Sequence, residues 1–126
     1  AALIGRPKLL ILDEPAAGLD PKGRDEILRG FKTLHEKQKI TVVLVSHSME
    51  DIANLVDKVL VMNKGKIVYF DTPRNVFKEA ETLEKIGLGV PQVTYLVREL
   101  RKKGYPIADC INIDEAKNEL LKLFKR

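Results

Sequence analysis

Two runs of aliphatic residues in the N-terminal half of the chain predict two strands. Leu9–Leu12 ends abruptly in Asp13 and Glu14, and residues 40–45 form a second run that is rich in β-branched side chains. Continuous apolar runs of this length are typical of strands that are buried on both faces in a parallel sheet. We therefore expect two such strands, with the carboxylates at the carboxyl end of the first.

The residues between the two runs predict a helix. Apolar positions recur at helical spacing from Ile27 to Leu34, and the pattern extends as far as about Lys37. Asp20 suits the N-cap position, and Pro21 suits the first helical position, where its missing N–H leaves nothing unsatisfied. The order strand, helix, strand indicates a βαβ unit.

A βαβ unit brings together residues that lie far apart in the sequence. Its two strands are parallel and belong to one sheet, so both end at the same edge. His47 follows the second run, and we therefore expect it to lie close to Asp13 and Glu14. Open α/β sheets bind their ligands at this edge.

The adjacent carboxylates suit phosphoryl transfer. One can hold a divalent ion while the other orients or deprotonates a water, as transfer from a Mg-nucleotide requires. The plainer alternatives are an ordinary strand that runs into an acidic turn and, for His47, a solvated residue at a helix start. His35, on the intervening helix, is expected to be a surface residue.

The middle of the chain predicts a short helix, a hairpin and a second helix. Ser48 and Asp51 fit a capping box that opens the short helix. Residues 58–70 form two apolar runs around residues 63–65, where a glycine is available for positive φ. A helix is then expected over residues 71–86.

The C-terminal part predicts two amphipathic helices. Residues 87–91 are rich in glycine and proline and indicate a linker, so we divide the chain into an α/β portion, residues 1–88, and a small, mostly helical extension, residues 89–126. The two apolar stripes of the extension either pack against each other or face a partner; they comprise Val93, Leu96, Val97 and Leu100, and Ala116, Leu120, Leu121 and Phe124.

Composition narrows the function classes. The 126 residues carry a formal charge of +4 with acidic and basic residues interspersed, so no basic stripe indicates nucleic-acid binding. A single cysteine, Cys110, excludes an internal disulfide, fits a reducing compartment and is expected to pack as a small apolar residue. No stretch approaches the roughly 20 apolar residues that span a bilayer, so a cytosolic protein is expected.

The motifs together resemble the ATP-binding cassette (ABC) ATPases over about residues 1–78. Leu9–Pro15 resembles their Walker B motif, residues 17–20 their D-loop, and residues 45–47 their switch histidine. Residues 49–51 and the hairpin at residues 62–66 also fit in order and spacing. Any one of these signals is weak, but the set is specific.

The resemblance implies a role for each site residue, with ATP and Mg²⁺ as cofactors. Asp13 would help to hold Mg²⁺, Glu14 would polarise the attacking water, and His47 would contact the γ-phosphate. The D-loop would communicate across a dimer that sandwiches the nucleotides; its residues here are Gly18, Leu19 and Asp20. Ala16 and Ala17 stand where many relatives carry hydroxyl residues, which casts little doubt on the chemistry.

Two family motifs are absent from the sequence. No glycine opens a phosphate-binding loop of the Gly-x-x-x-x-Gly-Lys-[Ser/Thr] type, and no Ser-Gly-Gly-Gln signature precedes the Walker B strand. In the family both lie upstream, and residues 1–7 are typical of a helix end stopped by Gly5 and Pro7. We therefore expect the C-terminal part of a P-loop NTPase domain, α/β with a parallel sheet. By itself it is expected to be inactive toward ATP.

Residues 87–94 and the helix that follows resemble the C-terminal extension of energy-coupling factor (ECF) ATPases, which power the uptake of vitamins and transition-metal ions, including cobalt. The resemblance implies pairing with a second ATPase subunit, identical or not. It also implies a transmembrane coupling protein, a substrate-binding membrane component and a peripheral location on the cytoplasmic face of the membrane. A generic helical appendage is the alternative.

Two other functions compete with this assignment. An ABC ATPase of another class, either another transporter or a protein that acts on DNA or ribosomes, would share the same core motifs. Pro15 and the sequence Gly18–Asp20 argue against the DNA and ribosome classes, as does the interspersed charge. The other candidate is a non-catalytic module that pairs through its tail.

Overall fold

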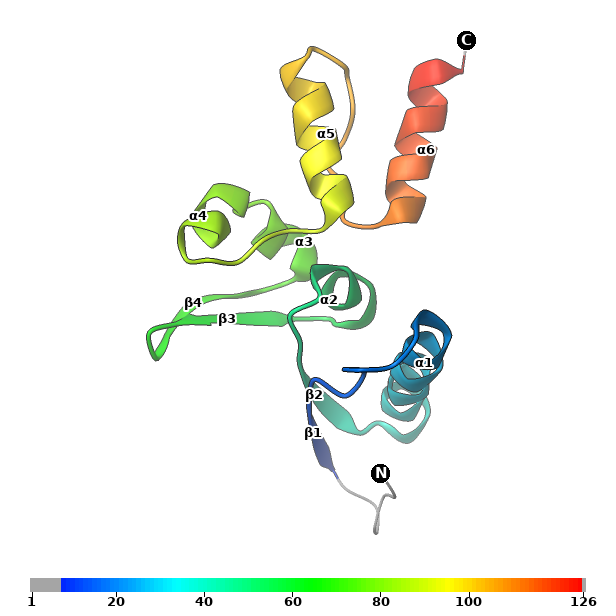
Figure 1. Cartoon of the computed structure of the whole chain (residues 1–126), viewed down its shortest axis with the longest axis vertical. Coiled ribbons are helices and arrows are strands. Elements are labelled where there is room, and N and C mark those ends of the chain that lie inside the picture. The colour runs from blue at the N-terminus through cyan, green and yellow to red at the C-terminus, as the bar shows by residue number, and fades with distance from the viewer. Residues whose placement is uncertain (1–7, 126) are drawn as a thin grey trace. The chain divides into compact units, whose positions relative to one another are not determined.

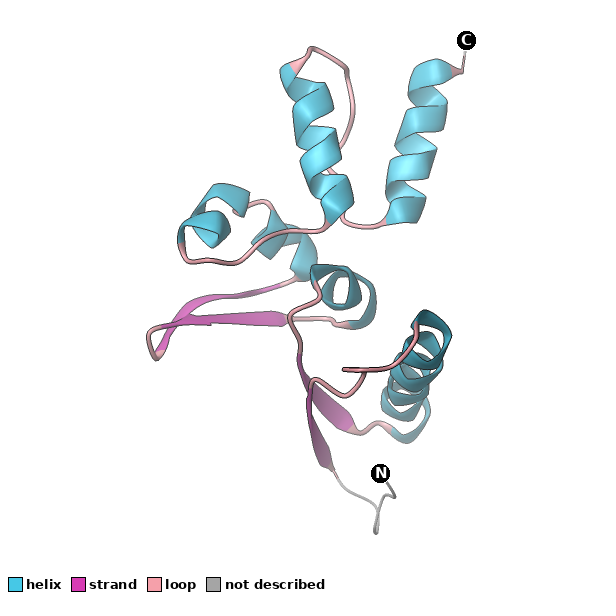
Figure 2. Ribbon diagram, viewed as in Figure 1, coloured by secondary structure: helices cyan, strands magenta, loops and turns pink. Residues whose placement is uncertain are grey.

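The computed structural model describes residues 8–125 (Figure 1). The contacts within the chain divide it into two compact units, with the boundary in the sequence after His47. The first unit holds one helix and a pair of strands, and the second holds a hairpin and the remaining helices (Figure 2). The helix end expected over residues 1–7 lies outside the described residues. None of the described helices is long and apolar enough to cross a membrane.

The first unit is the predicted βαβ arrangement. Strand β1 (Leu9–Asp13) pairs in parallel with β2 (Thr41–Val45), and helix α1 (Pro21–Gln38) connects them. The helix begins where the sequence predicts, because the Asp20 carboxylate accepts a hydrogen bond from the Gly23 amide at 3.2 Å. It ends at Lys39, whose φ of 54° places it in the left-handed region.

The expected burial of the two strands on both faces is wrong for the described residues. Leu10 and Leu12 alternate with exposed residues along β1, where Leu9 and Ile11 remain 52% and 65% exposed. The same alternation along β2 leaves Val43 44% exposed. A run that is apolar on both faces needs a packed layer on each side, and residues 8–125 bury one face more than the other.

The second unit opens with a capped helix and a hairpin, as predicted. Helix α2 (Met49–Leu55) starts at Ser48, whose hydroxyl accepts a hydrogen bond from the Asp51 amide at 3.2 Å. Strands β3 (Val59–Asn63) and β4 (Lys66–Asp71) are antiparallel. The turn residues Lys64 and Gly65 both have positive φ, 51° and 76°, which matches the twist of the strands.

The single helix expected to end near Ile86 is wrong, because the structure has two. Helix α3 (Pro73–Phe77) and helix α4 (Ala80–Lys85) are separated at Glu79, whose φ of −90° and ψ of 42° leave the helical region. The apolar residues around the break are all buried, and Val76 and Phe77 are 1% and 2% exposed. Packing against the core accompanies this break, and no glycine or proline marks it in the sequence.

Residues 87–91 are buried only at Val90 and Pro91, while Leu88 is 38% exposed. Gly87, with φ of 87°, ends α4 and donates to the Glu84 carbonyl at 3.0 Å, while Leu88 donates to the Leu83 carbonyl at 2.9 Å. Val90 then packs into the main hydrophobic cluster, 3% exposed. The predicted division of the chain into domains at residue 88 stays a prediction. The boundary between the two compact units of the structure falls after His47.

The two stripes of the tail pack partly against each other. They lie on α5 (Gln92–Lys102) and α6 (Ile113–Phe124), which stand side by side in Figure 2. Their shared cluster contains Val97, Ile107, Cys110 and Ala116, with Val93, Leu100 and Leu120 packed on it. Leu121 and Phe124 stay exposed, at 55% and 72%, as does Leu96 at 46%.

Cys110 is fully buried in this cluster, as a small packed residue should be. Desolvation raises the pKa of its thiol, which disfavours the reactive thiolate. The structure therefore assigns Cys110 to packing.

Candidate functional site

Glu14 stands where the chain leaves the sheet, and its backbone has an uncommon conformation. Its φ is 47°, in the left-handed region that non-glycine residues adopt rarely. Its amide still donates to the Val45 carbonyl at 2.9 Å, and its carbonyl accepts from the Ala17 amide at 3.1 Å. Glu14 is thus held by the sheet on one side and by the following turn on the other. Backbone strain of this kind is found at functional sites.

The structure brings His47 and Glu14 together. His47 Nδ1 lies 2.6 Å from Glu14 Oε1, at the distance of a charge-assisted hydrogen bond when the imidazole is protonated. The His47 side chain is 91% exposed and that of Glu14 is 32% exposed. The predicted proximity of His47 to Glu14 is therefore confirmed. The proximity of His47 to Asp13 and the catalytic roles of these residues stay predictions.

One oxygen of the Glu14 carboxylate is buried. Oε1 is itself buried and accepts no hydrogen bond of regular geometry among the described residues, so the close imidazole is its polar neighbour. A buried carboxylate oxygen without a regular donor is costly unless a charge or a water satisfies it. This carboxylate is accordingly well placed to accept a proton or to hold a water.

Asp13 is the last residue of β1 and pairs in register with Val45. Its side chain is exposed. Among the described residues, no three His, Cys, Asp or Glu side chains converge as a metal-binding group. Mg²⁺ is commonly held by one or two carboxylates, with substrate phosphates and waters completing its octahedron. The donor set therefore fits Mg²⁺ that arrives with a nucleotide, and it does not fit a self-contained metal centre.

The three D-loop candidates lie between β1 and α1. Gly18 has φ of 79°, which favours glycine, while a Cβ there would meet no atom within 4 Å. The requirement for glycine is thus conformational. Leu19 is 43% exposed, and Asp20 caps α1 through its contact with Gly23. Asp20 therefore has a structural role that would persist whether or not the loop contacts a partner.

Outside this site, His35 is exposed, as expected for a surface residue, and its Nδ1 lies 2.8 Å from the Ile40 carbonyl oxygen. A group of basic side chains in the second unit was not predicted from the sequence; they come from α3, α5 and the residue that follows α3. Their spacing was the available signal: Arg74 and Lys78 are four residues apart, and Arg98 and Arg101 are three apart.

A scan against protein-family models finds no match for the chain. The chain is 60% identical over 121 residues to the energy-coupling factor transporter ATP-binding protein EcfA2 of Caldanaerobacter subterraneus subsp. tengcongensis, covering 95% of the chain and 42% of that relative. It is 49% identical over 111 residues to the EcfA1 protein of the same organism, covering 87% of the chain and 40% of that relative. The chain thus spans less than half the length of these relatives.

Among solved structures, the chain is similar to CbiO1 from Clostridium perfringens, described as part of the ABC transporter complex CbiONQ. The TM-score is 0.54 at 36% sequence identity, and the match covers 73% of this chain and 37% of that one. The shared architecture is that of ABC ATPases, mixed α/β with parallel strands followed by helices.

Proposed function

We propose that this chain is part of an ATP-hydrolysing subunit, because it belongs with the ATP-binding proteins of energy-coupling factor transporters. It spans 42% of the length of the EcfA2 relative. The whole subunit would power import by an ECF-type transporter. The observation that carries this proposal is the contact of His47 with Glu14, 2.6 Å apart beyond the ends of two parallel strands.

In the proposed reaction, a water attacks the γ-phosphorus of ATP and the β–γ bridging oxygen leaves with ADP. Glu14 orients the water and takes its proton, a role that suits a carboxylate with one buried, poorly satisfied oxygen. His47 is exposed enough to leave Glu14 and donate to a γ-phosphate oxygen. Asp13 would hold Mg²⁺, which neutralises phosphate charge when it is bound with the nucleotide.

The phosphate-binding loop and signature motif that the family uses are not found in the sequence. The chain alone has no glycine-rich backbone to cradle the β- and γ-phosphates. We therefore propose that it neither hydrolyses ATP nor binds Mg-ATP tightly by itself. A complete subunit would supply the missing groups.

The proposed partners are a second ATPase subunit, identical or not, a transmembrane coupling protein and a membrane component that binds the transported solute. The exposed D-loop, with Gly18, Leu19 and Asp20, is available to communicate across an ATPase dimer. Leu121 and Phe124, 55% and 72% exposed, lie three positions apart on one face of α6. They support pairing through the tail, because burying this apolar face against a partner would be favourable.

The proposed location is peripheral, on the cytoplasmic face of the membrane, where the ATPase pair would meet the coupling protein. The proposed cargo class is vitamins or transition-metal ions, including cobalt. The membrane component would set this specificity, since the site described here is built to handle phosphate.

Replacing Glu14 with Gln in a complete subunit that carries this sequence tests the proposal. The amide keeps the shape of the side chain and loses the base, so ATP turnover should fall by about 10²–10⁴-fold while ATP binding persists. Glu26→Gln, on the exposed face of α1, is the matched control and should leave turnover unchanged. Turnover of the Glu14 variant within about twofold of wild type would refute the role of the base.

A further inference from the structure

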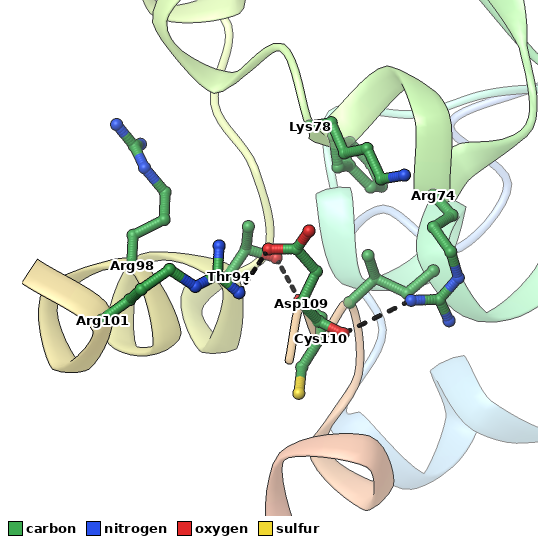
Figure 3. A pocket seen from close by; sticks show the side chains of 9 residues that line it. Arg74, Lys78, Thr94, Arg98, Arg101, Asp109 and Cys110 are labelled. Atoms are coloured by element: carbon green, nitrogen blue, oxygen red, sulfur yellow. Dashed lines mark hydrogen bonds and ion pairs between the residues drawn. The ribbon is translucent and has the colours of Figure 1, made fainter. Parts of the chain in front are cut away.

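A cavity of about 350 Å³ in the second compact unit has four cationic residues among the nine that line it (Figure 3). Among the described residues that line it, Arg74, Lys78, Arg98 and Arg101 are cationic, and Asp109 is the single acid. Two helical segments supply these cations: α3 with the residue that follows it, and α5. All of them belong to the same compact unit, separate from the unit that holds Glu14 and His47.

Two of the arginines are fixed by neighbours. Arg74 Nη2 lies 2.6 Å from both carboxylate oxygens of Glu115, and this hydrogen bonding raises the pKa of Arg74. Arg101 donates to the Ile107 carbonyl oxygen at 2.9 Å and pairs with Asp109 Oδ1 at 2.8 Å. Cations held in place in this way lose little further freedom when they bind an anion.

Lys78 is the exception, because its side chain makes no hydrogen bond or ion pair with residues 8–125. It extends on the same side of its segment as Arg74, one helical turn away (Figure 3). Because Arg74 is already paired with Glu115, Lys78 is the lining cation that has no acidic partner in the described part of the chain.

The Asp109 carboxylate lines the cavity. Figure 3 shows it between the side chains of α3 and those of α5, where it meets Arg101. The planar carboxylate pairs with one arginine, Arg101. The backbone carbonyl oxygen of Asp109 lies 3.5 Å from Arg74 Nη1. An external anion would therefore compete with this carboxylate for Arg101.

We propose that this cavity binds a small phosphate-bearing anion through Lys78 and Arg101, with Asp109 as an internal competitor. A phosphate group presents three terminal oxygens and can accept from the cations of both helical segments at once, unlike the carboxylate. The Arg98 side chain points away from Asp109 (Figure 3), and its Nη1 lies 3.3 Å from Glu84 Oε1. The site goes beyond the proposed ATPase function, because it needs neither Mg²⁺ nor the Glu14–His47 pair.

Titration of the whole chain with pyrophosphate, followed by amide NMR in the presence of EDTA, tests the proposal. The signals of residues 74–78, 94–101 and 109–111 should shift saturably, with a dissociation constant of about 1 mM. Lys78→Gln should weaken binding by about fivefold, whereas Asp109→Asn should tighten it by about threefold, because removing the competitor frees Arg101. Citrate carries carboxylates instead of phosphates and should therefore bind more weakly than pyrophosphate.

Matched variants separate this site from general charge attraction. Lys66→Gln and Asp25→Asn make the same charge changes at exposed positions elsewhere and should alter affinity by less than about 1.5-fold. The proposal is overturned by the absence of saturable shifts up to about 20 mM pyrophosphate. Equal weakening by both lysine variants, equally tight binding of citrate, or shifts centred on Glu14 and His47 would overturn it as well. Lys78 is exposed, so its variant should keep the wild-type spectrum before titration.

Discussion

In the first compact unit, Ile11 and Val43 remain 65% and 44% exposed on the sheet, whereas in the second unit Leu83 and Val97 are each 1% exposed in continuous clusters. The second unit is not uniformly closed, since Leu60 and Met62 of its hairpin are about half exposed. Several helices nevertheless pack around the core of the second unit. The described residues of the first unit, by contrast, form one helix and two strands.

The difference shows what holds the candidate catalytic residues in place. Glu14 and His47 lie in the unit with the smaller core, so their positions depend on backbone pairing and helix capping more than on side-chain packing. The Glu14 amide continues the parallel ladder to Val45, and Asp20 fixes the start of α1 after the D-loop. Substitutions in the two units should therefore have unequal effects.

The largest expected difference is between core and sheet-face truncations. Leu83→Ala should lower the free energy of unfolding of the second unit by about 2–5 kcal/mol, because it removes buried methyl groups and leaves a cavity. Ile11→Ala in the first unit should cost less than about 0.5 kcal/mol in this chain, since its side chain is already exposed. Urea unfolding followed by the NMR signals of each unit measures both. Equal costs would contradict the comparison.

A second contrast concerns the exposed apolar surface of the tail. In a complete subunit, Leu121→Asp together with Phe124→Asp should weaken nucleotide-free dimers at least about tenfold, because an unpaired charge is costly to desolvate. Asn118→Asp adds charge at an exposed position of the same helix and serves as the control. Light scattering reports the mass, and circular dichroism checks that the helices remain. Dimers that survive the double substitution would show that this face is not the pairing surface.

The smallest predicted effect lies in the cap that supports the D-loop. Asp20→Ala should destabilise the first unit by about 1 kcal/mol, since the Gly23 amide loses its partner. Asp25→Ala, within the same helix and exposed, should change stability by less than about 0.5 kcal/mol. Thermal unfolding of the chain, followed at the NMR signals of α1, compares the stability of the two variants. A loss at Asp25 as large as that at Asp20 would mean that helix charge, rather than capping, explains the effect.

Sequence patterns located the first unit well because its organisation is local. The run at Leu9–Asp13, the cap at Asp20 and the run at residues 40–45 each have a short-range signature, and handedness and parallel pairing then place His47 beside Glu14. The exposure of Ile11 could not be predicted, because it depends on which residues cover the sheet. The left-handed backbone of Glu14 also has no sequence signal.

The second unit was harder to predict because its features depend on long-range packing. The break at Glu79 lacks a glycine or proline, and Val90 is buried although its segment has the composition of a linker. The basic cavity assembles side chains from α3, α5 and residues 109–111, more than thirty residues apart at its extremes. Such assemblies become visible when the packing is known.

The central claim is that Glu14 and His47 act together in one hydrolytic site. In a complete subunit, Glu14→Gln and His47→Ala should each reduce ATP turnover, by about 10²–10⁴-fold for Glu14. Residues that act as a unit are strongly non-additive, so the double variant should be no more than about threefold slower than Glu14→Gln alone. Losses that multiply in the double variant would show that the two residues act independently and would contradict the account.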